Sequence, residues 1–524
     1  MKIKALGKFL ILLIAVGAAF GGWKLFQRTQ GGGGGSGSIP NVPEAMKIDG
    51  DQGILGRPLR VGVVTWPGYA GGIVANGGFK PTRESIFWNN HRLLVEFMLM
   101  EDVDARGKAF AKGGPDGVDI VWSTVDFWAN ELPGLRKGGV NSKAIMQVDW
   151  SRGGDAIVAT GNINRIEDLV DKKISLALFT PSHWLLEYSL QNSSLSDSQQ
   201  SKIVKGLIGK NASPDARIDF VAGKVDAAVV WEPDVAECLK KRPGSHIIVS
   251  SKTASNLIAD LMVAREDFIK DHPDVIRAFV NGWLEGTTEA NRRPDLAVKV
   301  LMENEPLYKD LGQQATLDQL TSVKWADLAD NVQMFGLDGS EPLFDRIFAS
   351  ASRAWVKRGY ISQPVSASVA KDATFLKETY DKGEVKVQPP RSDENIPKPT
   401  EKIKESKPVM TKPANIYFAS GRANLDPNGK AMLDQIALTA QTFANAYIRV
   451  EGNTDNVGSA STNVALSQQR AQAVVNYLVE HYHFNRNRFI AKGNGPNKPI
   501  SSNSSESGRS QNRRTDIMVV PADN

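Results

Sequence analysis

The residues best suited to binding chemistry lie near the C-terminus. Alternating apolar residues before Asn453 predict a strand that ends at a turn containing Asp455, and Asn463 then suits the N-cap of a helix. Asn463 and Arg470 are spaced i and i+7, so they share one face of that helix. The loop carboxylate of Asp455 and the helix guanidinium of Arg470 can therefore converge.

A carboxylate and a guanidinium that converge suit a zwitterionic ligand. The carboxylate accepts an ammonium group, the Arg binds a carboxylate through two parallel hydrogen bonds, and free N–H groups at the helix start add donors. The diaminopimelate side chain of a peptidoglycan stem peptide is such a zwitterion. The alternative is a surface Asp–Arg ion pair, worth under about 1 kcal/mol.

Over about residues 415–520 the chain resembles the outer-membrane protein A-like peptidoglycan-binding family, whose fold is α+β. Asn453 stands where that family usually has His, and residues 493–495 read Gly-Asn-Gly where it has Gly-Tyr-Gly. Both departures leave the charged pair intact. The resemblance implies a diaminopimelate site made by Asp455 and Arg470 and supported by Thr454, Asn463, Asn512, Arg513 and Arg514.

A second unit, upstream, contains short apolar runs separated by helical segments. Such alternation predicts parallel α/β sheets, in which ligands bind outside the carboxyl ends of the strands. Each run ends in a polar or aromatic turn, so all of these turns are placed where a ligand binds. The four runs are Leu59–Val64, Val118–Trp122, Ile174–Leu178 and Ala227–Val230.

The string Gly223–Pro233 resembles the nitrate, sulfonate and taurine family of periplasmic substrate-binding proteins, and so does Phe268–Pro273. The resemblance covers about residues 57–388. It implies two α/β lobes that close on a small molecule, with the inner lobe at about 153–250. The chain is expected to cross between the lobes near Asp149-Trp150 and between Ser250 and Ser255.

Side chains at the strand ends are the candidate contacts for a small anionic or zwitterionic solute. Thr180 and Ser182 can bind an anion at a helix start, or can merely cap that helix. Trp66 and Trp231 can stack on a ligand, or can belong to the core. The complete set of candidates is Trp66, Tyr69, Ser123, Asp126, Thr180, Ser182, His183 and Trp231.

The sequence indicates no catalytic, cofactor or metal site, so we expect a protein that is not an enzyme. The 6 histidines lack metal-ligand spacing, and no Gly-x-Ser-x-Gly elbow or phosphate loop is present. The single Cys238 cannot form an internal disulfide. The 63 Lys and Arg residues are interspersed with 58 Asp and Glu residues, so nucleic acid is not an expected partner.

The N-terminus carries an apolar run, Phe9–Trp23, that follows three lysines. One interpretation is an uncleaved transmembrane helix within residues 1–27, with the lysines in the cytoplasm and Trp23 at the far interface. The other is a signal peptide cleaved near Gly17-Ala18-Ala19. We favour the anchor because the cleavage site is imperfect. Both interpretations place the bulk of the chain in the periplasm.

A chain of 524 residues is expected to fold into two or three domains. Two linkers are expected between the folded parts of this chain. Residues 28–56 include a Gly/Ser-rich flexible stretch, and residues 389–413 are rich in Pro and Lys. The second linker is expected to be extended and to separate the substrate-binding-like unit from a wall domain at 414–520. That domain should begin with a strand at 416–418 and a helix at Asp426-Pro427.

These features predict an inner-membrane, single-pass protein that binds peptidoglycan and displays a solute-binding or sensing module between membrane and wall. Membrane protein partners are compatible with that architecture. Two alternatives remain: the substrate-binding component of an ABC importer, and a stator-like energy-coupling subunit. The second is disfavoured because Phe9–Trp23 contains no carboxylate to carry a proton.

Overall fold

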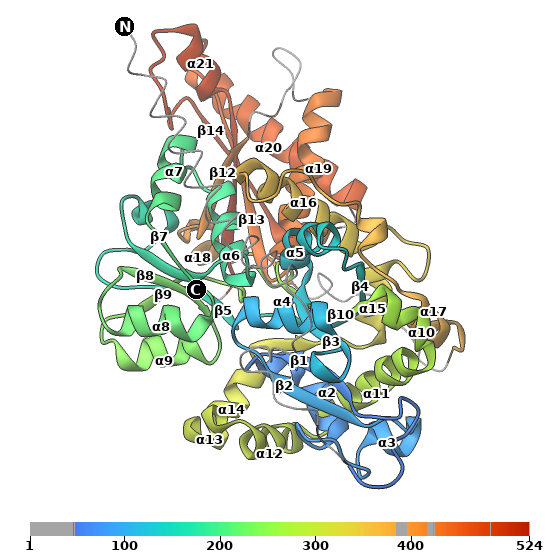
Figure 1. Ribbon diagram of the computed structural model, residues 1–524. Coiled ribbons are helices and arrows are strands. Elements are labelled where there is room, and N and C mark those ends of the chain that lie inside the picture. Colours follow the sequence, from blue (N-terminus) through green and yellow to red (C-terminus); the bar gives the residue numbers. More distant parts are fainter. Residues whose placement is uncertain are drawn as a thin grey trace, which may run out of the picture.

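The computed structural model describes residues 46, 48–383, 396–414, 416, 423, 425–482 and 484–522. The expected anchor at 1–27 and most of the expected strand at 416–418 lie outside these residues. Within the described part of the chain, no helix is both long enough and apolar enough to cross a membrane. The architecture is mixed α/β, with three separate sheets (Figure 1).

The first lobe is built on a six-stranded sheet with the order β11-β4-β10-β3-β1-β2. Its β1 runs parallel to β2 and β3, whereas β10 runs antiparallel to β3 and β4. The parallel arrangement expected for the strand runs is confirmed for β1 and β3, and the antiparallel strands β10 and β11 make the whole sheet mixed. The strands are β1 (Leu59–Val63), β2 (Val95–Leu99), β3 (Ile120–Thr124), β4 (Ser142–Ser151), β10 (Ala259–Arg265) and β11 (Val323–Trp325).

The second lobe is built on a five-stranded sheet with the order β7-β6-β8-β5-β9. Here too the sheet is mixed: β6 is parallel to β7 and β8, while β5 is antiparallel to β8 and β9. The strands that run against the majority are β10 and β11 in the first sheet and β5 in the second, and the chain passes between the lobes from β4 to β5 and from β9 to β10. The strands are β5 (Asp155–Ala159), β6 (Ile174–Ala177), β7 (Leu207–Lys210), β8 (Ala227–Trp231) and β9 (His246–Ser250).

Helices cover both sheets, and several begin at Ser or Thr residues whose side chains cap the helix N-terminus. Thr124 accepts from the N–H of Phe127 at 3.3 Å, and Ser196 forms a capping box with Gln199. The helices of the two lobes are α2 (Ala70–Asn76), α3 (Ile86–His91), α4 (Val103–Lys112), α5 (Val125–Lys137), α6 (Pro181–Gln191), α7 (Asp197–Lys205), α8 (Ser213–Val221), α9 (Asp234–Lys241), α10 (Glu266–Asp271), α11 (Pro273–Arg292), α12 (Pro294–Asn304), α13 (Pro306–Leu311), α14 (Gln313–Leu320), α15 (Leu328–Phe335), α16 (Leu343–Arg358) and α17 (Thr374–Asp381).

The C-terminal unit has its own four-stranded sheet, ordered β12-β15-β13-β14. The predicted helix start is confirmed: Asp426 caps α19 by accepting from Gly429 N–H at 2.7 Å, with Pro427 in the first turn. The strands are β12 (Met410–Ala414), β13 (Ala446–Asn453), β14 (Phe489–Gly495) and β15 (Thr515–Pro521), and the helices are α18 (Glu401–Glu405), α19 (Pro427–Thr442), α20 (Ala460–Tyr482) and α21 (Glu506–Asn512).

The expected extended linker at 389–413 is wrong for the residues described from 396 onward. Residues 401–405 form α18, whose Ile403 is buried, and 410–414 form β12, which pairs with β15. Apolar residues at 403 and 410 fall where they can be covered by the C-terminal sheet, so burial overrides the Pro- and Lys-rich composition. This segment belongs to the C-terminal unit.

The C-terminal unit also contacts the second lobe and the segment that leads out of it. The backbone N–H of Asn256 donates to Thr442 O at 3.0 Å, and its side chain donates to Gln441 O at 3.1 Å. Lys412 donates to Asn192 Oδ1 at 3.1 Å, and the ring of Tyr188 lies 6.1 Å from that of Phe443. The expected separation of the two units is therefore wrong.

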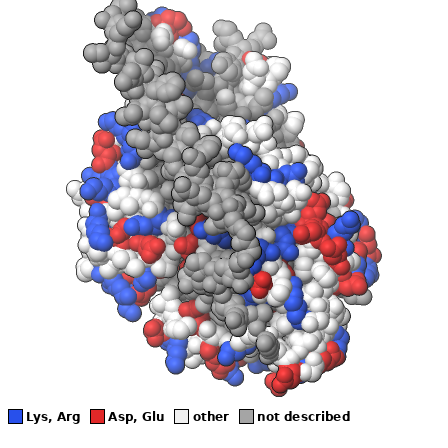
Figure 2. Space-filling model, in the orientation of Figure 1, with Lys and Arg blue, Asp and Glu red and all other residues white. Residues whose placement is uncertain are grey.

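Charged side chains of both signs are intermixed over the face shown in Figure 2. No broad area of a single sign is visible among the residues coloured on that face.

Two glycines let α20 lie directly on the C-terminal sheet. A Cβ built on Gly452 would lie 2.3 Å from Ser467 O, and one built on Gly493 would lie 2.4 Å from Gln468 N. Both clashes are with helix backbone, which cannot move without shifting the whole helix. The position of α20 over the sheet therefore depends on the absence of side chains at these positions.

We expect Gly493→Ala to destabilise the C-terminal unit by about 1–3 kcal/mol, because its methyl group must displace the α20 backbone. Gly107→Ala is the matched control: a Cβ there meets nothing within 4 Å, and Ala favours the helix by up to about 1 kcal/mol. Urea unfolding followed by circular dichroism measures both effects. A Gly493→Ala protein as stable as wild type would contradict the packing described.

Candidate functional site

The turn after β13 fixes the carboxylate of Asp455. Its Oδ1 accepts from the backbone N–H of Val457 at 3.0 Å, and its Oδ2 accepts from Arg513 Nη1 at 2.7 Å. Thr454 anchors the same turn, since its N–H donates to Gly495 O at 2.9 Å. The turn is therefore held by β14 and by the residue that follows α21, two elements distant in the sequence.

Two guanidinium groups gather at this carboxylate, not one. Burial lowers the pKa of Arg470, the positive charge of Arg513 lowers it further, and the negative charge of Asp455 raises it. Arg470 and Arg513 are thus close enough to repel each other, and Arg470 also lies near Asp455. Arg513 also pairs with Glu506 at 2.7 Å, and its side chain remains 39% exposed. The arrangement offers two cationic forks to a ligand carboxylate and one carboxylate to a ligand ammonium.

Asn463 lies at this site but does not cap the helix. The helix α20 begins at Ala460, and Ser459 is its cap, accepting from Thr462 N–H at 3.1 Å. The expected N-cap role of Asn463 is therefore wrong, because a serine one turn earlier takes it. Asn463 instead donates to Val457 O at 3.0 Å and so secures the loop that carries Asp455.

Asn512 and Arg514 point away from Asp455. Asn512 accepts from the N–H groups of Ile500 and Ser501 at 2.8 and 3.0 Å and donates to Ser501 O and Asn503 Oδ1 at 2.8 and 2.9 Å. Arg514 makes two hydrogen bonds of 2.9 Å to Asp516. These two residues hold a loop and a strand, and of the three consecutive residues only Arg513 contacts Asp455.

The two positions that depart from the family pattern form one buried network. Asn494 donates to Asn453 Oδ1 at 3.0 Å and to Glu451 Oε2 at 2.7 Å, while Asn453 donates to Asp516 Oδ2 at 2.9 Å. Lys498 also pairs with Glu451 at 2.6 Å. Two asparagines thus replace a histidine and a tyrosine as partners of neighbouring carboxylates.

A second candidate site lies between the two lobes. Its cavity volume is about 10 Å³, close to the minimum that holds one water molecule. The walls come from both lobes and consist of Val64, Trp66, Tyr69, Trp122, Asp155, Pro181, Trp231 and Asp260. The structure therefore places Trp66, Tyr69 and Trp231, three of the sequence candidates, around one cavity.

The remaining candidates lie around it rather than in its wall. Thr180 occupies the N-cap position of α6, but its hydroxyl donates to Ala177 O at 2.7 Å instead of capping the helix. Ser182 is fully buried, and its hydroxyl has no hydrogen-bond partner among the described residues. Burial lowers the pKa of His183 to about 3, so the imidazole is neutral and packs against Tyr360 and Trp355 in the core. Ser123 and Asp126 are buried at the junction of β3 with α5.

Sequence reasoning missed the carboxylates that dominate this cleft. Asp149 lies near the end of β4 and accepts from Trp66 Nε1 at 3.0 Å, and Asp260 accepts from the Tyr69 hydroxyl at 2.6 Å. Asp155 begins β5 and accepts from Ser151 Oγ at 2.6 Å. All three lie on the strands that carry the chain between lobes. The sequence predicts the first crossing near Asp149-Trp150, but it does not mark these carboxylates as ligand contacts.

Burial dominates the electrostatics of the cleft. It raises the pKa of Asp126 and of Asp149 to about 8 and that of Asp155 to about 7. Burial also raises the pKa of Asp260, and the negative charge of Asp149 raises it further. At neutral pH Asp126 and Asp149 are therefore mostly protonated, and Asp155 is about half protonated.

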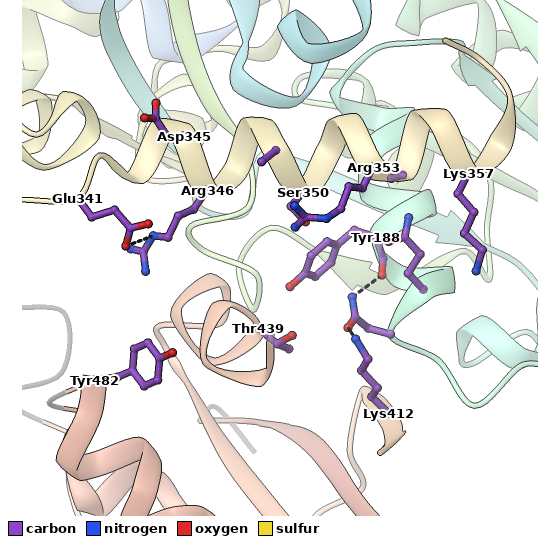
Figure 3. A pocket seen from close by; sticks show the side chains of 14 residues that line it. Tyr188, Glu341, Asp345, Arg346, Ser350, Arg353, Lys357, Lys412, Thr439 and Tyr482 are labelled. Carbon is purple, nitrogen blue, oxygen red and sulfur yellow. Dashed lines mark hydrogen bonds and ion pairs between the residues drawn. The ribbon is translucent and has the colours of Figure 1, made fainter. Parts of the chain in front are cut away.

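A larger cavity, of about 590 Å³, lies where the C-terminal unit meets the lobes (Figure 3). Arg346, Arg353 and Lys357 project into it from α16, across from Thr439 and Tyr482 of the C-terminal unit. Lys412 and Tyr188 close one side. The cavity holds basic and acidic side chains together, and none of the sequence candidates lines it.

Comparison with known proteins separates the chain into two matched segments. The OmpA family model matches residues 417–513, and the NMT1/THI5-like family model matches residues 154–297. The chain therefore carries an OmpA-like domain at its C-terminus and a segment of the NMT1/THI5-like type before it. Both resemblances noted in the sequence are confirmed.

Individual relatives match the C-terminal domain. Outer membrane protein A of Bordetella avium is 37% identical over 107 residues, which is 20% of this chain and 55% of that protein. Peptidoglycan-binding protein ArfA of Mycobacterium tuberculosis is 36% identical over 104 residues, 20% of this chain and 32% of that protein. The chain thus spans about half or less of the length of these relatives.

Among solved structures, the periplasmic aliphatic sulphonate binding protein SsuA of Escherichia coli is 13% identical, with a TM-score of 0.45. The alignment covers 59% of this chain and 96% of that chain.

The buried carboxyl groups predict that stability falls as pH rises from 6.5 to 8. Their folded-state pKa lies above the unfolded value of about 4, so the folded state binds more protons in this window and loses stability as they ionise. The Asp149→Asn variant should lose part of this slope, at most about 1.4 kcal/mol per pH unit.

Thermal unfolding at several pH values measures the slope. Asp168→Asn is the control, because hydrogen bonds lower the pKa of Asp168 and remove it from this window. An Asp149→Asn protein with the wild-type slope would show that Asp149 is ionised in the folded state at these pH values.

Proposed function

We propose that this protein is a non-enzymatic component of the cell envelope that binds peptidoglycan through its 414–520 domain and displays a solute-binding module at 57–388. The observation that carries the proposal is the grouping of Asp455, Arg470 and Arg513. The match to the OmpA family and the relative named for peptidoglycan binding support the wall-binding half.

The ligand at this grouping is the zwitterionic end of a diaminopimelate-containing stem peptide. Its carboxylate enters between Arg470 and Arg513 and relieves the repulsion that lowers the pKa of Arg470. Its ammonium is bound by Asp455, which gives up part of its pairing with Arg513. Thr454 and Asn463 act by holding the Asp455 turn, and Asn512 acts by holding the 500–503 loop.

The solute-binding half is supported by the NMT1/THI5-like match and by a cavity built from both lobes. Trp66, Tyr69 and Trp231 are the sequence candidates that contact solute there. A soluble ABC-importer component is the alternative, but a wall-binding domain would hinder shuttling to a permease. The hydrogen bond between Asn256 and Thr442 joins the C-terminal domain to the solute-binding module, and this favours a function in which the two units are coupled.

The proposed location is the periplasmic side of the inner membrane, with residues 1–27 as the anchor. The support is the apolar run Phe9–Trp23 and the lysines before it, which remain in the cytoplasm. The absence of a carboxylate from that run still argues against a proton-carrying stator. Membrane partners of the anchor remain part of the proposal.

We predict that Asp455→Ala and Arg470→Ala each weaken binding to purified sacculi by roughly 10- to 100-fold, the effect of losing one hydrogen bond to a charged group. The double variant should lose less than the sum of the two, because both residues hold one ligand. Pull-down at one fixed salt concentration measures binding.

Arg486→Ala is the matched control for that experiment. Arg486 is exposed at the far end of α20, where it donates to Asn476 Oδ1 at 2.9 Å, so its loss removes one positive charge without touching the site. Retention of the Asp455→Ala protein on sacculi at the wild-type level would refute the assignment. An equal loss with Arg486→Ala would indicate non-specific charge attraction.

We predict that the mature protein keeps its N-terminus and sediments with membranes after carbonate washing. A variant lacking residues 2–27 should not reach the periplasm, since the same run directs export. Intact mass measurement decides the matter. A mature species that begins near Phe20 would refute the anchor and leave a periplasmic protein held by the wall alone.

A further inference from the structure

The interlobe cavity combines an aromatic wall with carboxylates. The rings of Trp122 and Trp231 approach edge to face with centroids 6.3 Å apart, one from each lobe. Asp155 and Asp260 complete the wall at the same cavity. Aromatic faces and carboxylates share one preference, because both attract a positive charge.

The carboxylates of this cleft have unused acceptor atoms. Asp155 Oδ1 and Asp149 Oδ1 are buried and have no hydrogen-bond partner, although the second oxygen of each side chain is satisfied by Ser151 or Trp66. Asp149 is 0% exposed and Asp155 is 2% exposed. A buried acceptor without a donor costs free energy. A ligand that donates a hydrogen bond to this acceptor removes that cost.

The positive charge near this cluster is already neutralised. Arg106 acts electrostatically on Tyr69, but it is paired with Glu131 and hydrogen-bonded to Trp122 O. No positively charged side chain is among the residues that line the cavity. The cavity wall therefore offers carboxyl groups and no cation to a ligand, which suits the ammonium end of a zwitterion better than an anion, the other solute class expected from the sequence.

A metal ion is a poorer fit than an organic cation. Across the described residues, no three His, Cys, Asp or Glu side chains are grouped so that they could hold one metal ion. The carboxylates are instead spread around tryptophan rings, which suit a cation that carries carbon as well as N–H donors.

We propose that the interlobe cleft binds an organic ammonium ion whose N–H groups donate to Asp155 in the cavity wall and whose carbon atoms lie against Trp122 and Trp231. The proposal rests on the solute-binding function proposed above and names its ligand class. The closed cavity has room for little more than the ammonium group, so a ligand enters when the lobes separate. A zwitterion fits if its ammonium end occupies this position.

Binding of such a cation also moves protons. The titratable and charged groups around the cluster are Tyr69, Arg106, Asp126, Asp149, Asp155, Glu232 and Asp260. Burial raises the pKa of Asp149 to about 8 and of Asp155 to about 7, so an arriving ammonium ion drives their ionisation and releases protons at pH 7. Affinity for an ammonium ion should therefore rise between pH 6 and pH 8.

Isothermal titration calorimetry of the full chain tests the proposal with three probes: butylammonium, tetramethylammonium and butane-1-sulfonate. The first and third match in length and differ in charge. We expect butylammonium to bind, tetramethylammonium to bind more weakly for lack of N–H donors, and the sulfonate not to bind. Asp155→Asn should weaken butylammonium binding at least tenfold, as loss of one charge-assisted hydrogen bond requires.

Asp168→Asn, which removes a carboxylate outside the cleft, should bind like wild type. Trp231→Phe provides a second variant if Asp155→Asn does not fold, and it should weaken both ammonium probes. Sulfonate binding that survives Asp155→Asn would overturn the ammonium assignment and leave the solute-binding function standing. If none of the three probes binds, both the ammonium assignment and the proposed solute-binding function are overturned. Loss of binding to sacculi bears on neither of these two proposals.

Discussion

Burial of carboxylates where the chain crosses between the lobes is the constraint on which the rest of the structure depends. Asp149, Asp155 and Asp260 lie on the crossing strands β4, β5 and β10, and Asp155 and Asp260 also line the cleft. A carboxylate in such a place is stable when protonated or when matched by a cation. The stability of the closed cleft therefore depends on the protonation of these carboxyl groups and on whether a cationic ligand is bound.

In the C-terminal domain, backbone packing holds a charged pair at the surface and leaves its side chains little conformational freedom. Gly452 and Gly493 allow α20 to touch the sheet backbone, and this contact fixes the height of Arg470 above the Asp455 turn. Arg513 reaches the same carboxylate from the segment after α21. Three elements thus meet at one point, and packing rather than charge determines the spacing.

The two sites share a piece of chain. Asn256 lies in the second crossing between the lobes and donates through its backbone and its side chain to residues at the end of α19. A change in the angle between the lobes must carry these hydrogen bonds along or break them. The C-terminal unit is therefore hydrogen-bonded directly to the segment that connects the two lobes.

The sequence by itself determined the features that local spacing controls. The end of β13 before Asp455, the shared helix face of Asn463 and Arg470, and the capped start of α19 follow from side-chain period and capping chemistry within a few residues. The strand ends that carry Trp66 and Trp231 follow in the same way. Both family resemblances rest on such short, ordered strings.

Only the tertiary structure decided which distant residues meet. It paired Asp455 with Arg513, 58 positions away, and it placed Asp155 and Asp260 in the wall of one cavity. It also folded residues 401–414 onto the C-terminal sheet, although their composition is that of a linker. Burial against a partner surface fixes each of these outcomes, and that surface exists only once the chain has folded.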